Sequence, residues 1–195
     1  DPFGTNGSGT TQTLLGTTGS AFTGFTAVRA SNSIGYFLPG NLGGFYGQAQ
    51  LYRGENPSTA GASEDDGNGL GVRVGYSSGP LNVALGLSST NAATGDIKQN
   101  NIGAQWDFGF TKLMGHFTFD EVGAQEGRGW LIGALVPVGA GEIRAAVSQY
   151  EVQAGAAEPR SRKMALGYVH NLSKRTAAYA TYARVTYSGG AASSA

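Results

Sequence analysis

RASNSIGYFLPGNLGGF, residues 29–45, contains an alternating run, a tight turn and the start of a second run. In the first run one side of an extended chain carries Ala30, Asn32, Ile34, Tyr36 and Leu38, and the other carries Arg29, Ser31, Ser33, Gly35 and Phe37. This period of two predicts a β-strand of about ten residues that stops at Pro39. A second alternating run follows from Phe45 to Tyr52. We therefore predict an antiparallel hairpin with one apolar face and one hydrophilic face.

The composition is unusual for a globular domain. The 195 residues carry 13 Lys and Arg against 13 Asp and Glu, so the formal net charge at pH 7 is zero, and we expect no nucleic-acid partner. Only 13% of the residues are charged and 33 are Gly, which leaves few side chains to solvate an ordinary surface. The chain has no Cys, which excludes disulfides and thiolate metal sites.

Hydropathy alone does not decide between a soluble sheet and a membrane barrel. The most apolar run, Trp130 to Val138, is far shorter than the roughly 18 residues of a membrane helix. A barrel strand needs only about 9 to 11 residues and alternates in polarity.

Alternation recurs along the chain and predicts ten strands, paired as hairpins, within residues 29–187. Short turns are expected at 39–44, 78–80, 109–111, 139–141 and 171–175, and longer polar segments near 53–68, 89–97, 121–128, 152–161 and beyond 186. Outer-membrane barrels have this rhythm, whereas a soluble β-sandwich has no reason to sort its loop lengths. The sequence therefore predicts an all-β fold, a transmembrane antiparallel β-barrel. Residues 1–28 have no period and are expected to form a long loop.

Two segments resemble the general trimeric porins of the Gram-negative outer membrane. That family has the pattern R-x-[DN/S]-N-S-[IV]-x-Y, followed by a Pro and by G-G-F; the matching residues are Arg29, Asn32, Ser33, Ile34, Tyr36, Pro39, Gly43, Gly44 and Phe45. A second match, YVHNLSKRT, runs from Tyr168 to Thr176. The resemblance implies a homotrimer of barrels of about sixteen strands, with residues 1–28 as a constriction loop folded into the pore. We then expect residues 1–195 to be one incomplete barrel domain, lacking about five strands before residue 1 and about one after residue 195.

The function expected from this reading is passive diffusion of small hydrophilic solutes and ions through an outer-membrane pore, without catalytic residues or cofactors. Charges facing the lumen set the sign of the preferred ions. The alternation assigns to the lumen Arg29, Arg73, Arg144 and Lys163 against Asp107 and Asp120. Four positive charges against two predict a preference for anions. Membrane lipid is the expected partner of the apolar face.

Catalytic and metal sites are poorly supported by the sequence. His116 and Asp120 lie four residues apart, which in a strand separates them by roughly 13 Å, too far for a direct hydrogen bond. His170 is expected at the membrane interface beside Tyr168. The acidic cluster Glu64 to Asp66 resembles part of a calcium loop but lacks its closing Glu, so a solvated loop is favoured and cation binding stays open.

Three alternatives stay open on the sequence alone: a soluble β-sandwich or lectin-like binding module, a barrel enzyme, and a sugar-specific porin. An enzyme needs a catalytic constellation in further strands. A sugar porin needs a row of aromatic side chains along the lumen, to which Tyr46, Tyr52 and Tyr150 could contribute. Several aromatic residues lie near predicted strand ends, as in an interfacial girdle, and this favours the membrane.

Overall fold

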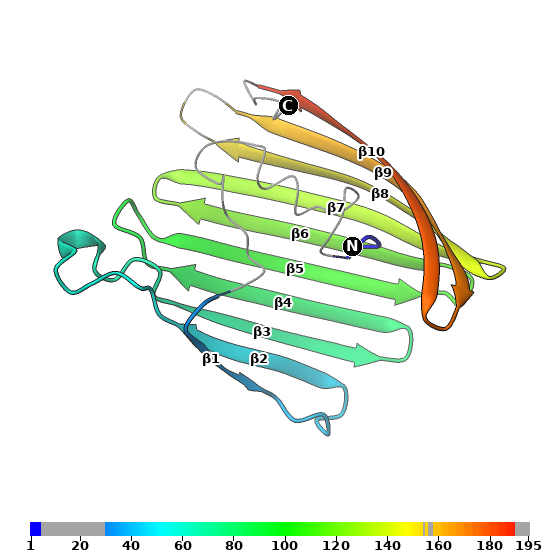
Figure 1. Cartoon of the computed structure of the whole chain (residues 1–195), viewed down its shortest axis with the longest axis horizontal. Coiled ribbons are helices and arrows are strands. Elements are labelled where there is room, and N and C mark those ends of the chain that lie inside the picture. The colour runs from blue at the N-terminus through cyan, green and yellow to red at the C-terminus, as the bar shows by residue number, and fades with distance from the viewer. Residues whose placement is uncertain (5–29, 154, 156–157, 190–195) are drawn as a thin grey trace.

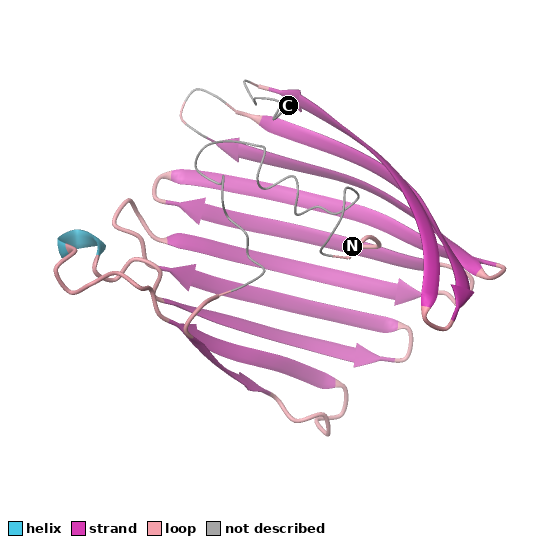
Figure 2. Ribbon diagram, viewed as in Figure 1, coloured by secondary structure: helices cyan, strands magenta, loops and turns pink. Residues whose placement is uncertain are grey.

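The computed structural model describes residues 1–4, 30–153, 155 and 158–189, which form one antiparallel sheet (Figures 1 and 2). Its ten strands are hydrogen-bonded in chain order: β1 Ser33–Phe37, β2 Phe45–Tyr52, β3 Gly69–Ser78, β4 Leu81–Thr90, β5 Ile97–Asp107, β6 Lys112–Val122, β7 Gln125–Val138, β8 Gly141–Gln153, β9 Arg160–Ser173 and β10 Thr176–Ser188. Among the described residues the helical structure is one 3₁₀ turn, Gly61–Ser63, and no helix has the length and apolar character to cross a bilayer. The predicted all-β antiparallel fold is confirmed, and the described sheet is not closed.

The sheet has two unlike faces. A Cβ added to Gly133 would lie 2.6 Å from Cδ of Pro2, and one added to Gly167 would lie 2.9 Å from Cε1 of Phe3. The first residues of the chain therefore lie against this face, which we call the inner face. In Figure 1 the N-terminus lies in front of the middle of the sheet, and β9 and β10 curve past it on the right. The opposite face is the outer face.

Burial follows the two faces residue by residue. In β7 the inner-face Leu131 is 1% exposed, whereas the adjacent outer-face Ile132 is 65% exposed. In β9 the inner-face Lys163 is 2% exposed and the adjacent Met164 58%. Since a strand sends successive side chains to opposite sides, the inner face of β7–β9 is covered and their outer face presents large apolar groups. Most water-soluble sheets show the reverse.

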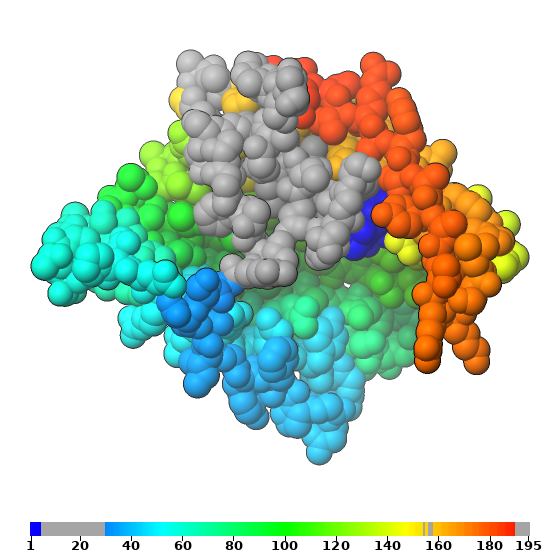
Figure 3. Space-filling view, viewed as in Figure 1, coloured from blue at the N-terminus to red at the C-terminus, as the bar shows by residue number. Residues whose placement is uncertain are grey.

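Short turns gather at one end of the sheet, and the long loops lie at the other end together with the two-residue turn Gly123–Ala124. Gly79–Pro80, Gly139–Ala140 and Lys174–Arg175 each join two strands at the short-turn end. Gly139 has φ +57°, a left-handed conformation that glycine adopts without the Cβ penalty. At the long-loop end, residues 53–68 and 91–96 connect neighbouring hairpins, and the first of these loops projects from the sheet as the cyan segment in Figure 3.

The first strand is shorter than predicted. β1 covers five residues instead of about ten, because Asn32 adopts φ +48° and leaves the extended conformation. Its Nδ2 donates a hydrogen bond of 2.9 Å to Oε1 of Glu55. Alternation therefore does not run unbroken from Ile34 back to Arg29. Arg29 and the predicted constriction loop, apart from residues 1–4, lie outside the described residues.

The predicted loop at residues 121–128 is instead formed by the end of β6 and the start of β7. Residues 121–128 were expected as a long polar connection, but only Gly123–Ala124 separates β6 from β7. Glu121 pairs with Glu126, so the polar residues extend the ladder. Gly123 has φ +58°, which a tight hairpin turn requires.

Candidate functional site

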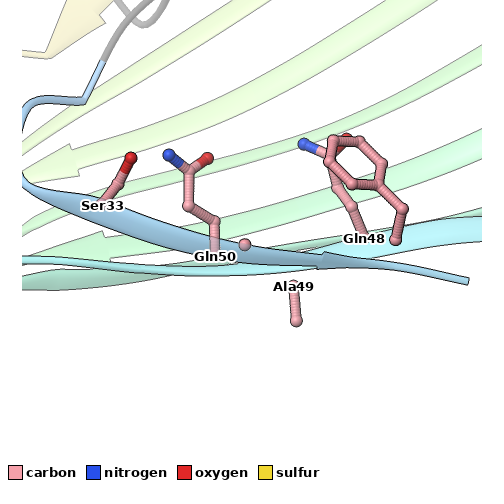
Figure 4. A pocket seen from close by; sticks show the side chains of 6 residues that line it. Ser33, Gln48, Ala49 and Gln50 are labelled. Atoms are coloured by element: carbon pink, nitrogen blue, oxygen red, sulfur yellow. The ribbon is translucent and has the colours of Figure 1, made fainter.

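The inner face of the sheet is hydrophilic from β1 to β4. Figure 4 shows Gln48 and Gln50 on one side of β2 and Ala49 on the other. A shallow pocket there is lined by Ser33, Gly35, Phe37, Gln48, Ala49 and Gln50. It lies beside β1, an edge of the described sheet, so its shape depends on what pairs with that edge.

Arg73 projects from β3 over an aromatic ring on this inner face. Its Cζ lies 5.6 Å from the ring centroid of Tyr46, within reach of a cation–π interaction. The Tyr46 hydroxyl donates a hydrogen bond to Oδ1 of Asn82. A side chain at Gly75 would collide with the Tyr46 ring, so glycine makes room for it. Arg73 has no carboxylate partner in the described part of the chain.

Two of the predicted inner-face charges are paired with charges that sequence reasoning missed. Asp107 at the end of β5 lies 3.3 Å from Nζ of Lys112 and accepts a hydrogen bond of 2.8 Å from the Gly109 amide. Nε of Arg144 donates a 2.7 Å hydrogen bond to Oε1 of Glu142 on the same strand. The two missed residues, Lys112 and Glu142, lie within the first two residues of β6 and β8. The predicted strands assigned no face to these first residues, which adjoin the turns.

Asp120 is buried on the inner face, and its carboxylate accepts two hydrogen bonds. Tyr150 donates to Oδ2 at 2.7 Å and Thr118 to Oδ1 at 3.1 Å. His116 is on the same face of β6, and no hydrogen bond to Asp120 is present among the described contacts. The arrangement is a structural hydrogen-bond group and does not resemble a base with its orienting acid.

Lys163 faces Ser148 on the neighbouring strand and is buried. Nearby Ser161 is fully buried, and its hydroxyl has no hydrogen-bond partner in the described part of the chain. Tyr150, which pairs with Ser161, is 2% exposed, so it does not offer an aromatic surface to a solute. The aromatic row of a sugar-specific porin therefore lacks one of its three expected members.

The charge balance of the inner face differs from the predicted four to two. Pairing register places on it the basic residues Arg73, Lys112, Arg144 and Lys163 and the acidic residues Asp107, Asp120 and Glu142, counted over the described strands. The balance is therefore four to three. Without Arg29, which lies outside the described residues, the predicted set gives three to two, so Lys112 and Glu142 add one charge of each sign and leave the excess of one positive charge unchanged.

The acidic cluster of the first long loop has a structural role. Asp65 accepts a hydrogen bond of 2.7 Å from Asn68, and Asp66 accepts one of 2.6 Å from the amide of Ala93 in the next loop. Asp66 thus joins the two loops, while Asp65 forms a contact within its own loop. Within the described ranges, no three His, Cys, Asp or Glu side chains gather where they could bind a metal ion.

The short-turn end of the outer face carries a group of aromatic side chains. Trp106, Phe108 and Phe110 follow one another with ring centroids 6.2 and 6.1 Å apart. Nδ1 of His170 lies 3.0 Å from the hydroxyl of Tyr168, so the two residues are neighbours, and their place at a membrane interface stays a prediction.

Comparison with known proteins relates the chain to bacterial porins. A sequence model of the Gram-negative porin family matches residues 1–190. Outer membrane porin protein 32 of Delftia acidovorans is 36% identical over 166 residues, which cover 80% of this chain and 46% of that protein.

Solved structures agree with this relationship. An anion-selective porin from Comamonas acidovorans superposes with a TM-score of 0.73 at 34% identity, covering 82% of this chain and 50% of that one. A loop-deletion mutant of OmpT from Vibrio cholerae shares the fold, with a TM-score of 0.64 at 14% identity over 92% of this chain and 68% of its own. The chain spans about half the length of the first two relatives.

Proposed function

Because the chain belongs to the Gram-negative porin family, we propose that it forms part of a water-filled channel through which small hydrophilic solutes and ions diffuse passively. The family resemblance read from the sequence is confirmed, and the chain is an outer-membrane protein. We propose neither a catalytic step nor a cofactor for this activity.

The observation that carries the proposal is the reversed polarity of the two faces. Large apolar side chains such as Ile132, Met164 and Leu166 are well exposed on the outer face. Charged and amide side chains lie on the inner face, including Arg73 and Gln48. An outer-membrane barrel requires an outward apolar band and a polar interior. A soluble sandwich would bury the apolar face against a second sheet.

The channel is proposed to favour anions, in keeping with the anion-selective relative. Arg73 is the main described source of this preference, since it is exposed and has no carboxylate partner in the described part of the chain. Arg144 and Lys112 contribute less, because Glu142 and Asp107 offset their charges. Lys163 and Arg29 are proposed to add positive potential at other points of the wall.

Reversal potentials in a salt gradient test this assignment. Arg73→Glu replaces a fixed positive charge by a negative one, so the zero-current potential of single channels in a planar bilayer should move toward cations. Arg128→Glu on the outer face is the matched control and should leave the potential unchanged. If Arg29→Glu, Arg73→Glu and Lys163→Gln all leave the potential unchanged, the proposed anion preference is wrong.

Two features of the assembled protein are proposed from the family. Residues 1–28 fold inward and narrow the pore, and the barrels associate as homotrimers. Deleting residues 5–20 should raise single-channel conductance, and an unchanged conductance would contradict the constriction. Cross-linking in detergent should trap trimers; recovery of monomers alone would contradict the assembly.

A further inference from the structure

The outer face carries a band of charged side chains at the long-loop end of β5–β10. We call it the outer charged band; its members are Lys98, Glu121, Glu126, Arg128, Glu151, Arg160, Arg162 and Arg184. Pairing register fixes their face, because Arg128 pairs with Phe119 and Arg184 with Met164, both of which belong to the apolar outer face. Neither the channel nor its selectivity explains charges on this side.

The edge of the band that is nearer to the short turns crosses the strands at an angle. Arg184 in β10 lies on the pairing row that runs through Met164, Val147 and Ile132 to Gly115 in β6. On β6 itself the band ends at Glu121, six residues farther toward the loops, or about 20 Å along the strand. Four strand spacings amount to about 19 Å. The band therefore descends at about 45° to the strands, the angle at which a membrane surface crosses barrel strands.

Most of the band is internally neutralised, but two arginines are not. Ion pairs join Lys98 to Glu121, Arg128 to Glu126 and Arg160 to Glu151, with N–O distances of 3.1, 3.2 and 2.9 Å. No ion pair involves Arg162 or Arg184 within the described ranges. Both are exposed.

The two arginines are neighbours on adjacent strands. Arg162 pairs with Thr186, two residues from Arg184, so the two occupy a diagonal position on one face with a separation of about 7 to 8 Å. Apolar side chains begin directly below them with Met164 and Tyr182. Two arginine residues are thus diagonal neighbours where the apolar surface ends.

We propose that Arg162 and Arg184 bind the phosphate groups of anionic lipids in the outer leaflet. A guanidinium group matches the geometry of a phosphate and can donate two parallel hydrogen bonds to it. An arginine at the edge of a lipid-facing surface extends its head toward the headgroups, where basic side chains attract anionic lipid. The band has five basic and three acidic residues, so its net charge complements a phosphorylated surface. The inference rests on the proposed function, since it needs the long-loop end to lie at the outer leaflet.

Lipid titration of the full-length detergent-solubilised protein tests the proposal. The probe is lipid A, a diglucosamine lipid with two phosphates, compared with its dephosphorylated form. The double variant Arg162→Gln/Arg184→Gln should bind lipid A about 10- to 30-fold more weakly. The control Lys174→Gln/Arg175→Gln removes the same charge from the short-turn end of the same strands and should bind like the parent protein. Dephosphorylated lipid A should not distinguish the variants.

Three results would overturn the proposal. Equal weakening in both double variants would mean that net charge alone governs binding. Unchanged binding together with reduced heat resistance of the trimer would make the arginines a subunit contact. Displacement of lipid A by millimolar inorganic phosphate would indicate a site for free anions. Conductance of the same samples separates this proposal from the channel: a protein that binds lipid A but does not conduct would contradict only the proposed function.

Discussion

At the scale of single residues, the hydrogen bond from Tyr150 stabilises the carboxylate of Asp120, which is buried on the inner face. Asp120 is 3% exposed and Tyr150 2%, and the O–O distance is 2.7 Å. Tyr150→Phe removes the donor and leaves the buried carboxylate with the weaker hydrogen bond from Thr118. We expect the free energy of unfolding to fall by about 1 to 3 kcal/mol. This free energy can be measured by urea unfolding in detergent, with the folded fraction read from the heat-dependent gel shift.

Tyr182→Phe is the control for this substitution. Tyr182 is 70% exposed on the outer face, and no hydrogen bond of its hydroxyl is present among the described contacts. The same chemical change should therefore alter the unfolding free energy by less than about 0.5 kcal/mol. Equal effects in the two variants would contradict the importance of the Asp120 contact.

Alternation predicted the faces of single residues well, but not their surroundings. Arg73, Arg144, Lys163, Asp107 and Asp120 all lie on the predicted side of the sheet, while their part in ion selection stays a prediction. A period of two in the sequence does not show which residues pack against a face of the sheet, so it did not predict that Lys163 is buried. Nor does it give cross-turn partners such as Lys112, which depend on register.

At the scale of elements, three of the two-residue turns contain a left-handed glycine, Gly79, Gly123 or Gly139, whereas the Lys174–Arg175 turn does not. A Cβ on Gly139 would meet nothing within 4 Å, so the cost of Gly139→Ala comes from its φ of +57° alone. We expect a loss of about 1 kcal/mol in unfolding free energy. Gly115→Ala in β6 is the matched control, because its Cβ also meets nothing but its φ is ordinary for a strand. That variant should be neutral or slightly stabilised in the same urea unfolding assay.

Strand existence was predictable from the sequence, whereas strand boundaries were not. Ten strands follow from apolar periodicity, which a sheet with one apolar face and one polar face requires. The start of β1 is set by a left-handed Asn32, and nothing in the local sequence distinguishes it from an extended asparagine. The ends of β6 and β7 extend beyond the apolar zone, because backbone pairing between Glu121 and Glu126 continues although their side chains are charged.

At the scale of the whole molecule, the sheet presents edges that lipid would not tolerate. β1 and β10 each pair with one neighbour among the described strands. In hydrocarbon every unpaired backbone group costs several kcal/mol, so in the membrane both edges require partner strands. The chain matches only about half the length of the first two relatives.

The polarity of the two faces can be tested by placing one charge on each. Ile132 is at the middle of β7 on the outer face, and Gln105 is on the inner face of β5. Ile132→Lys puts an ammonium group into lipid near the membrane midplane and should lower the folding free energy in bilayers by about 2 to 4 kcal/mol. Gln105→Lys puts the same group into the lumen, where water solvates it, and should cost less than about 0.5 kcal/mol. The ion selectivity of the Gln105→Lys channel should also shift further toward anions, because the new positive charge adds to that of Arg73 on the channel wall. Folding titrations into lipid vesicles that find equal losses for both variants would contradict the assignment of the outer face to lipid.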